Sequence, residues 1–594
     1  MRTRLRFINS SKFSVVAAAL FGSSATAQPG CPEAGLVVGQ ERISVTTGGF
    51  GGNIDPGDRF GVRLANLGDV DGDGINDIAA GAPFDDDGAA NIGAVYILFM
   101  NADGTVRDER KLSGIDVFGG DTPSSLAVSE PVRFGSALAG LGDLDGDGVP
   151  DLAVGAPGER PLPIDSEVGS VRILFLDPDG SVKRGVRITE GEGGFLGQLD
   201  AFGQFGTGLD NLGDVDGDGN IDLAVSGTDV LIGSERRGAV WILLLTEQGE
   251  VKLDRRFTTD DLGVSNIDAN NSQEFGNDIA ALGDLDGNGS IEIAVGAPFR
   301  LPAAFAGVQR VGSVSVLSVD SKATVTNLTE FPQAGGPLEA QLSLPSGFGT
   351  GLGSIDDIDG DGVTDLAVGT AFDSVSADQD GSIWAMTLNP DGSVKAARQI
   401  GLGLSGFVGP LGAEARFGGG IADLGDLDGD GFPEIGVGIG GFTRNQLNET
   451  PATQGAFFVL ELDDCETPPR ITQQPTPAAQ IATFGDTVHL SVAAEGDGAL
   501  TYLWRRDGTP LMDGDEVTGS TTPMLSLTAS AATEGVYDVV ISNGFGDAMS
   551  DPAVLGVRGV GDAGCNDADI ALPAGILDGA DVNAFITSFG AGCP

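Results

Sequence analysis

The chain has 594 residues, and 32 lysines and arginines against 86 aspartates and glutamates give it a formal net charge of −54. This acidity argues against a nucleic-acid partner and against an anionic membrane surface, because both require a basic face. A Ser-His-Asp, Cys-His or histidine-rich metal site would have only His489 to draw on.

The N-terminus has the pattern of a secretory signal peptide. Basic residues precede an apolar stretch at 13–21, and Ala25-Thr26-Ala27 follows as a cleavage site. We expect residues 1–27 to be removed after Ala27 and the mature chain to be secreted, extracellular or at the cell surface. No apolar stretch of the sequence is long enough to span a bilayer directly. Outside the cytoplasm the four cysteines can form disulfides.

A repeat of about 70 residues dominates residues 28–465, the first predicted domain. A nine-residue pattern, D-x-D-x-D-G-x-x-D with Asn or Glu variants, occurs six times between residues 69 and 434. Each copy follows a Phe-Gly pair and precedes an apolar run and a further β-rich run, so each repeat offers about four short strands. A fixed period of this size is typical of a propeller, solenoid or array, and four strands make one propeller blade. We therefore predict a mainly β fold with a six-bladed β-propeller.

The ends of the repeat array predict how the propeller closes. The last β-rich run ends near Asp463 without a partner strand, whereas residues 42–45 resemble the strands that end other repeats. We expect this N-terminal strand to complete the last blade, which also removes exposed sheet edges. Closure would bring Cys31 near Cys465, and a disulfide between them would stabilise the ring by roughly 4–5 kcal/mol.

The repeated acidic loop predicts a calcium site. Carboxylates at positions 1, 3, 5 and 9, a backbone carbonyl at position 7 and a glycine at position 6 can surround a hard cation such as Ca²⁺. The loop is not an EF-hand, because position 12 of the first copy is Ala80, within an expected strand. The alternative for a single copy is an acidic turn, but six copies in register favour metal. The fourth loop has one acidic side chain fewer, so we expect it to bind most weakly.

The predicted ligands, with the position-7 carbonyl last in each loop, are as follows: Asp69, Asp71, Asp73, Asp77 and Ile75; Asp143, Asp145, Asp147, Asp151 and Val149; Asp214, Asp216, Asp218, Asp222 and Asn220; Asp284, Asp286, Asn288, Glu292 and Ser290; Asp357, Asp359, Asp361, Asp365 and Val363; Asp426, Asp428, Asp430, Glu434 and Phe432. About six Ca²⁺ ions would therefore bind, and folding should be coupled to them.

Phe-Gly, the acidic loop and Gly-Ala-Pro, which occurs at 81–83, 155–157 and 296–298, resemble the FG-GAP repeats of the integrin α-chain propeller. The resemblance covers about residues 35–463. It implies Ca²⁺ on one face and protein partners on the opposite face. The family has seven repeats, so a seven-bladed propeller is the alternative to six. Three repeats lack Gly-Ala-Pro and no transmembrane helix follows, so the resemblance implies an adhesion or recognition scaffold rather than an integrin-like receptor.

Residues 466–558 resemble an immunoglobulin-like β-sandwich. Trp504 matches the core tryptophan of such domains, and Tyr537 matches their tyrosine corner. Val492 and Val539 replace the usual cysteine pair, so we expect the core to be held by packing. The single histidine lies on the outward phase of its strand and is expected at the surface.

Residues 559–594 form a short C-terminal module with Cys565 and Cys593 near its ends, which we propose as a disulfide pair. Residues 581–589 have the apolar spacing of a short amphipathic helix. The segment resembles GC-type dockerin-like modules, which implies a possible further Ca²⁺ site and a cohesin-like or cell-envelope anchor partner. The acidic residues lack regular spacing, so a disulfide-pinned helical cap without metal stays open as the alternative.

Two functions follow from these features. The first is a secreted, calcium-binding recognition or adhesion protein for an extracellular protein or carbohydrate ligand, anchored by its C-terminus. The alternative is an extracellular hydrolase or lyase acting on polysaccharide through carboxylates on the propeller. We predict no catalytic residue, because the clear acidic clusters belong to the repeated loops. A carboxylate of raised pKa in the central channel would favour the enzyme, and an apolar or aromatic patch would favour binding.

Overall fold

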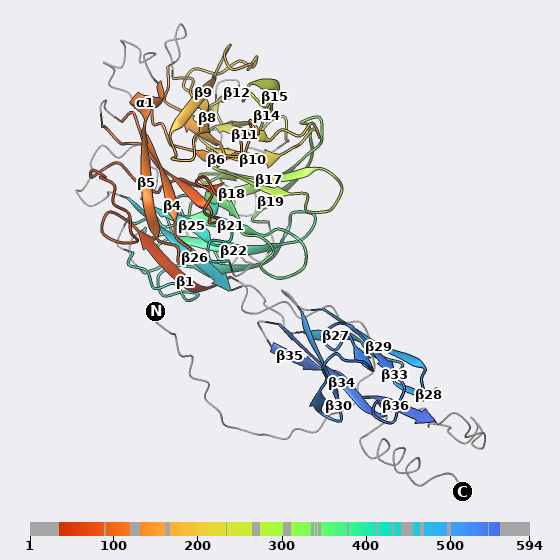
Figure 1. Cartoon of the computed structure of the whole chain (residues 1–594). Coiled ribbons are helices and arrows are strands. Elements are labelled where there is room, and N and C mark those ends of the chain that lie inside the picture. The colour runs from red at the N-terminus through yellow and green to blue at the C-terminus, as the bar shows by residue number, and fades with distance from the viewer. Residues whose placement is uncertain are drawn as a thin grey trace. The chain divides into compact units, whose positions relative to one another are not determined.

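The computed structural model describes residues 35–558, except 88–90, 119–130, 161–166, 233–234, 264–273, 301–310, 334–337, 339–340, 343–345, 377–378, 412–413, 430–432, 441–454, 464–468, 496–499 and 544–545. The predicted signal peptide, the Cys31–Cys465 and Cys565–Cys593 pairs and the C-terminal module lie outside the described residues. Within the described part the chain is almost entirely β (Figure 1). No helix there is long and apolar enough to cross a membrane.

The described residues between 36 and 463 form six four-stranded antiparallel sheets of the same design. In chain order the strands are β1 (Leu36–Ile43); β2 (Leu64–Gly68), β3 (Asp77–Ala82), β4 (Ala94–Met100) and β5 (Val106–Ser113); β6 (Leu138–Gly140), β7 (Leu152–Ala156), β8 (Ser170–Leu176) and β9 (Val182–Ile188); β10 (Leu209–Gly213), β11 (Asp222–Gly227), β14 (Ala239–Leu245) and β15 (Val251–Thr258); β16 (Ile279–Gly283), β17 (Ile291–Ala297), β18 (Ser313–Val319) and β19 (Val325–Phe331); β20 (Phe348–Ser354), β21 (Leu366–Thr370), β22 (Ser382–Leu388) and β23 (Val394–Ile400); β24 (Ile421–Asp423), β25 (Ile435–Ile439) and β26 (Ala456–Asp463).

The N-terminal strand closes the propeller, as the sequence predicts. Strand β1 pairs antiparallel with β26, with Leu36 opposite Asp463 and Ile43 opposite Phe457, so the last sheet has the order β1-β26-β25-β24 (Figure 1). The innermost strands β2, β6, β10, β16, β20 and β24 each contact the next one, and β24 contacts β2 again. The arrangement is therefore a closed ring of sheets, with one innermost strand from each sheet around its centre.

The Phe-Gly pairs link one sheet to the next. Phe134 is fully buried, and a parallel bridge joins it to Gly93, the residue before β4 of the preceding sheet. Gly93 has a φ of +88°, and a Cβ there would lie 2.1 Å from the Phe134 carbonyl oxygen, so only glycine permits this approach. The same bridge recurs at Phe60, Phe205, Phe348 and Phe417. The repeat thus encodes both the sheet and its contact with its neighbour.

Two small elements interrupt this pattern within the described residues. The helix α1 (Gly114–Phe118) follows β5, and a two-stranded hairpin of β12 (Leu231–Ile232) and β13 (Glu235–Arg236) lies between β11 and β14. Neither alters the order of the four-stranded sheets.

Residues 470–558 form two further sheets. One contains β27 (Arg470–Thr476), β29 (Thr487–Glu495), β33 (Met524–Thr528) and β32 (Val517–Thr518); the other contains β28 (Ala479–Thr483), β36 (Ala553–Arg558), β34 (Gly535–Asn543), β30 (Thr501–Arg506), β31 (Thr509–Pro510) and β35 (Gly546–Met549).

The core of these two sheets is built from the residues that the sequence singles out. Trp504 is fully buried and its Nε1 donates to the Thr522 carbonyl oxygen at 2.9 Å. The Tyr537 hydroxyl donates to the Thr533 carbonyl oxygen, and Val492 and Val539 lie in the same apolar cluster. The single histidine is exposed. These placements agree with the expected packing, while the immunoglobulin-like identity and the domain boundaries stay predictions.

Candidate metal centre

Each acidic loop joins the innermost strand of a sheet to the second strand. Among the described residues, five of the six loops bring three carboxylates together with one oxygen of each within 4.8 Å of the others. These groups are Asp69, Asp71 and Asp77; Asp143, Asp145 and Asp151; Asp214, Asp216 and Asp218; Asp284, Asp286 and Glu292; and Asp357, Asp359 and Asp361. In the sixth loop Asp430 and Phe432 lie outside the described residues. The structure therefore gathers positions 1 and 3 in five loops, with position 5 or 9 as the third member.

The carboxylate of the position-1 aspartate accepts hydrogen bonds from the backbone of its own loop and so fixes the shape of the turn. Asp69 Oδ1 accepts hydrogen bonds from the backbone N–H groups of Gly72 at 2.7 Å and Asp73 at 3.0 Å, and its Oδ2 accepts one from Gly74 at 2.8 Å. Gly72 and Gly74 have φ values of +79° and +91°, a region that favours glycine. The D-x-D-x-D-G pattern thus specifies a tight turn even before any ion is considered.

The side chain at position 5 caps the residue at position 7. Asp73 Oδ1 accepts from the backbone N–H of Ile75 at 3.0 Å, and the corresponding pairs occur in the next four loops. These pairs place the predicted carbonyl donors Val149, Asn220, Ser290 and Val363 in the same turn position as Ile75.

The position-9 carboxylate is buried and ties the loop to its sheet. Asp77 Oδ2 accepts from Val70 N–H at 3.0 Å, and its Oδ1 accepts from Met100 N–H at the end of β4 at 3.1 Å. Burial raises the pKa of Asp77 to about 6 and that of the corresponding Asp365 to about 8, with the neighbouring carboxylates adding to the effect. Both oxygens already accept hydrogen bonds, so this residue also has a structural role that the sequence pattern alone does not reveal.

The position-3 carboxylates show that the loops fit a cation. Asp71, Asp145 and Asp359 each have a buried Oδ1 that lacks a hydrogen-bond partner, and the Asp359 side chain is only 6% exposed. A buried carboxylate oxygen without a partner is costly, because it has lost its hydration. It lies among other carboxylates, so a hard cation is the partner that its charge favours. The oxygen-only donor set suits Ca²⁺.

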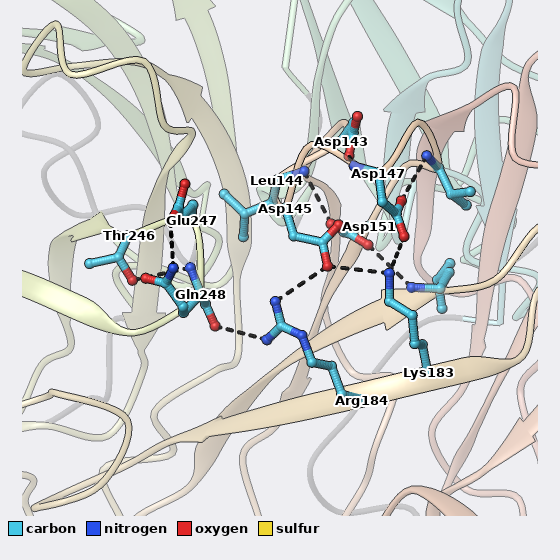
Figure 2. A network of polar contacts seen from close by, with 12 residues as sticks. Asp143, Leu144, Asp145, Asp147, Asp151, Lys183, Arg184, Thr246, Glu247 and Gln248 are labelled. Carbon is cyan, nitrogen blue, oxygen red and sulfur yellow. Dashed lines mark hydrogen bonds and ion pairs between the residues drawn. The ribbon is translucent and has the colours of Figure 1, made fainter.

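Basic side chains from the outermost strands also reach these loops, and sequence reasoning missed them. Lys183 lies against Asp145 at 3.3 Å and against Asp147 (Figure 2). Arg184 lies 3.3 Å from Asp145 and donates to the Gln248 carbonyl oxygen of the neighbouring sheet at 3.1 Å. Arg107, Lys252 and Lys395 make contacts like those of Lys183 in the first, third and fifth loops. The signal was present in the sequence, because each residue follows position 5 by 34 or 36 residues.

A second polar site lies at the centre of the ring. The innermost strands line a cavity of about 490 Å³, and the lining residues include Asp210, Asp278 and Asp423. Burial raises the pKa of Asp210 to about 7, and the charges of the other two carboxylates add to this. Arg63 lines the same cavity, where it donates to the carbonyl oxygens of Ser136 and Asn277 at 3.2 Å each. None of these residues belongs to the repeated loop pattern.

Comparison with known proteins agrees with the repeat described above. The FG-GAP repeat family matches at residues 60–98 and 134–174. Integrin alpha-5 of Xenopus laevis is 47% identical over 100 residues, which are 17% of this chain and 9% of that protein; integrin alpha-PS5 of Drosophila melanogaster is 40% identical over 112 residues, 18% and 9% respectively.

Phosphatidylinositol-glycan-specific phospholipase D of Mus musculus is 34% identical over 175 residues, 29% of this chain and 19% of that protein. The solved structure of titin M4 matches 16% of this chain at 20% identity, covering 98% of titin M4, with a TM-score of 0.14 that is too low to bear on the fold. The chain thus spans less than a fifth of these curated relatives. Within the matched segments it carries FG-GAP repeats and is similar to integrin α chains, which confirms that part of the resemblance.

Proposed function

We propose that this chain is a secreted, calcium-binding recognition or adhesion protein built on a six-bladed FG-GAP propeller. The observation that supports calcium most directly is the buried Oδ1 of Asp359, which has no hydrogen-bond partner and lies among the carboxylates of its loop. The Oδ1 atoms of Asp71 and Asp145 are likewise buried and lack a hydrogen-bond partner. The similarity to integrin α chains supports a recognition role.

The residues that would hold the ion are those at positions 1, 3, 5, 7 and 9 of each loop. A bound Ca²⁺ would neutralise carboxylates that otherwise repel one another. The chain itself supplies the rest of the arrangement: the position-1 aspartate shapes the turn, and the position-9 carboxylate connects it to the backbone of the third strand. The innermost, second and third strands of a sheet are thereby joined at one end, so we expect calcium to stabilise each sheet.

Thermal unfolding of the mature chain in Ca²⁺ and in excess chelator tests this proposal. Each occupied site adds about 2.7 kcal/mol at a free Ca²⁺ concentration one hundred times its Kd, so the melting temperature should fall clearly in chelator. Asp357→Asn should bind one Ca²⁺ fewer in a calorimetric titration. Asp391→Asn is the matched control, because it removes the same charge from an exposed turn of the same sheet. Identical melting curves with and without chelator would refute calcium binding.

The recognition role and the C-terminal attachment need separate tests. The mature chain should bind extracellular protein or carbohydrate probes on an array in Ca²⁺ and lose that binding in chelator. Deletion of residues 559–594 should release the protein from the cell surface or from its extracellular complex. Binding that survives chelation would separate recognition from the metal loops, and unchanged retention after the deletion would refute the anchor.

The central cavity favours one other candidate, an extracellular hydrolase or lyase. Asp210 has a pKa raised to about 7 by burial, within the range of a general acid, and it lines a cavity with two further carboxylates. Its two oxygens accept the backbone N–H groups of Asn211 and Ala281, which supports a structural role instead. Polysaccharide turnover by the mature chain that disappears in Asp210→Asn would establish the enzyme; absence of turnover leaves the recognition proposal.

A further inference from the structure

The outermost strand of each of the six sheets carries an irregularity at the same place. In the fifth sheet Val394 pairs with Leu388 and Ala396 pairs with Thr387, so Lys395 is the extra residue of a β-bulge. A bulge redirects a side chain and increases the local twist. The residues at this bulge position are Arg107, Lys183, Lys252, Thr326, Lys395 and Val38.

The basic bulge residues are directed at the loop of their own sheet. Lys395 Nζ lies 2.7 Å from Asp359 Oδ2 and 2.6 Å from Asp361 Oδ2, and so contacts positions 3 and 5 together. The first, second and third sheets have the same pair of contacts. In four loops a side-chain cation therefore lies against two of the proposed Ca²⁺ ligands.

The bulge residue and the position-9 residue vary together. Where the bulge residue is basic, position 9 is aspartate; where it is Thr326 or Val38, position 9 is the longer Glu292 or Glu434. The fifth loop has four acidic side chains and one basic neighbour, whereas the fourth has three acidic side chains and no basic residue at the bulge. The two loops thus have equal net charge, which removes the reason for expecting the fourth to be weakest.

We propose that the basic bulge residue is a tethered counter-ion, which neutralises the empty loop and competes with Ca²⁺ for the carboxylates at positions 3 and 5. The bulge residue then divides the loops into two classes: four in which it is basic, and two, with Thr326 and Val38, in which it is not. The proposal rests on calcium binding by the loops. It adds that loops with a tethered cation need a higher Ca²⁺ concentration to fill, so the sites fill in stages.

Three charge variants of the full mature chain test the competition. Lys395→Met removes the cation of the fifth loop, and Thr326→Lys places one at the bulge of the fourth. Lys322→Met is the matched control, because it makes the same substitution in an exposed turn of the fourth sheet. Ca²⁺ affinities are measured by titration against a chromophoric chelator, and stability is measured by melting in excess chelator.

In Lys395→Met one site should bind Ca²⁺ roughly tenfold more tightly, because a unit charge a few ångströms from a divalent ion is removed. The same variant should melt at a lower temperature than the parent in chelator. Thr326→Lys should weaken Ca²⁺ binding at one site by a similar factor. Lys322→Met should change the Ca²⁺ affinity and the melting temperature in chelator by less than the two test variants do. Unchanged affinities in both test variants would overturn the tethered counter-ion. Failure of the parent chain to bind Ca²⁺ would instead overturn the proposed function itself.

Discussion

Replacement of Arg63 by methionine should destabilise the centre of the ring. The Arg63 side chain is only 9% exposed, and its guanidinium donates to carbonyl oxygens in three other sheets, those of Ser136, Asn277 and Gly419. Its Nη1 also lies 3.3 Å from Asp278 Oδ2, and the Asp278 side chain is equally buried. Methionine fills a similar volume but leaves the three carbonyls without this donor and the carboxylate without its charge partner.

The expected cost is large, because removal of one member of a buried ion pair typically costs 3–5 kcal/mol. Burial raises the pKa of Asp278, and the nearby charge of Arg63 offsets part of that effect, so loss of Arg63 should raise the pKa of this carboxyl further. Arg63→Met combined with Asp278→Asn also removes the carboxyl that has lost its partner, so the double variant should lose less stability than the sum of the single variants. This non-additivity is the specific signature of the pair.

Urea unfolding in saturating Ca²⁺ measures these differences. Trp241 and Trp384 are buried in the propeller sheets and the third tryptophan is Trp504, so fluorescence in a Trp504→Phe background reports on the propeller alone. Val38→Ala is a suitable control, because Val38 is 58% exposed and surface substitutions usually change stability by less than about 0.5 kcal/mol. A loss below about 1 kcal/mol in Arg63→Met, or strictly additive single variants, would refute this account of the ring centre.

Three further predictions concern the same ring. Burial raises the pKa of Asp210 to about 7 in the folded state, so its protonated form favours folding, and its contribution to the free energy of unfolding should decline as pH rises from about 4 to 7. Asp210→Asn should therefore flatten that part of the stability profile of the Ca²⁺-saturated protein, and an unchanged profile would contradict the prediction. Phe60→Ala should lower the free energy of unfolding in urea by about 3–5 kcal/mol, because Phe60 is fully buried and its ring centroid lies 5.3 Å from that of Tyr96 and 5.9 Å from that of Phe457. A loss below about 1 kcal/mol would contradict this packing. Gly140→Ala should lower the melting temperature, because a Cβ there would lie 1.9 Å from the Asn66 carbonyl oxygen of the neighbouring sheet; an unaffected melting curve would show that the inner strands can separate.

The features that recur in every repeat could be predicted from the sequence, because the residues that form each of them lie within one repeat or in adjacent repeats. The Phe-Gly pair, the acidic turn and the apolar run each act within one sheet or between adjacent sheets, and the structure has them where the pattern places them. The pairing of β1 with β26 was also predictable, since a strand without a partner at one end of the array matched a spare strand at the other.

What depends on the closed ring could not be predicted in this way. Arg63, Asp210 and Asp278 meet only because separate sheets converge at the centre, and no spacing in the sequence expresses that convergence. The basic residue at the bulge was missed for a different reason. Lys395 occurs in a short strand with an ordinary pattern. A similar spacing from position 5 recurs in three other repeats, but the spacing gains its meaning only from the bulge in the pairing of β22 with β23, which turns the side chain toward the loop.

The pairing of β1 with β26 also determines when the propeller can be completed during synthesis. Among the described strands, β1 is the first to emerge and the last to find its partner, because β26 is made only after the other five sheets have been translated. Contacts between such distant segments form slowly, since the chain must close a long loop before they add stability. Between the synthesis of β26 and its pairing with β1, the edge of β26 is unpaired and can accept β1 from a second copy of the chain. Domain swapping is therefore most favoured in this period.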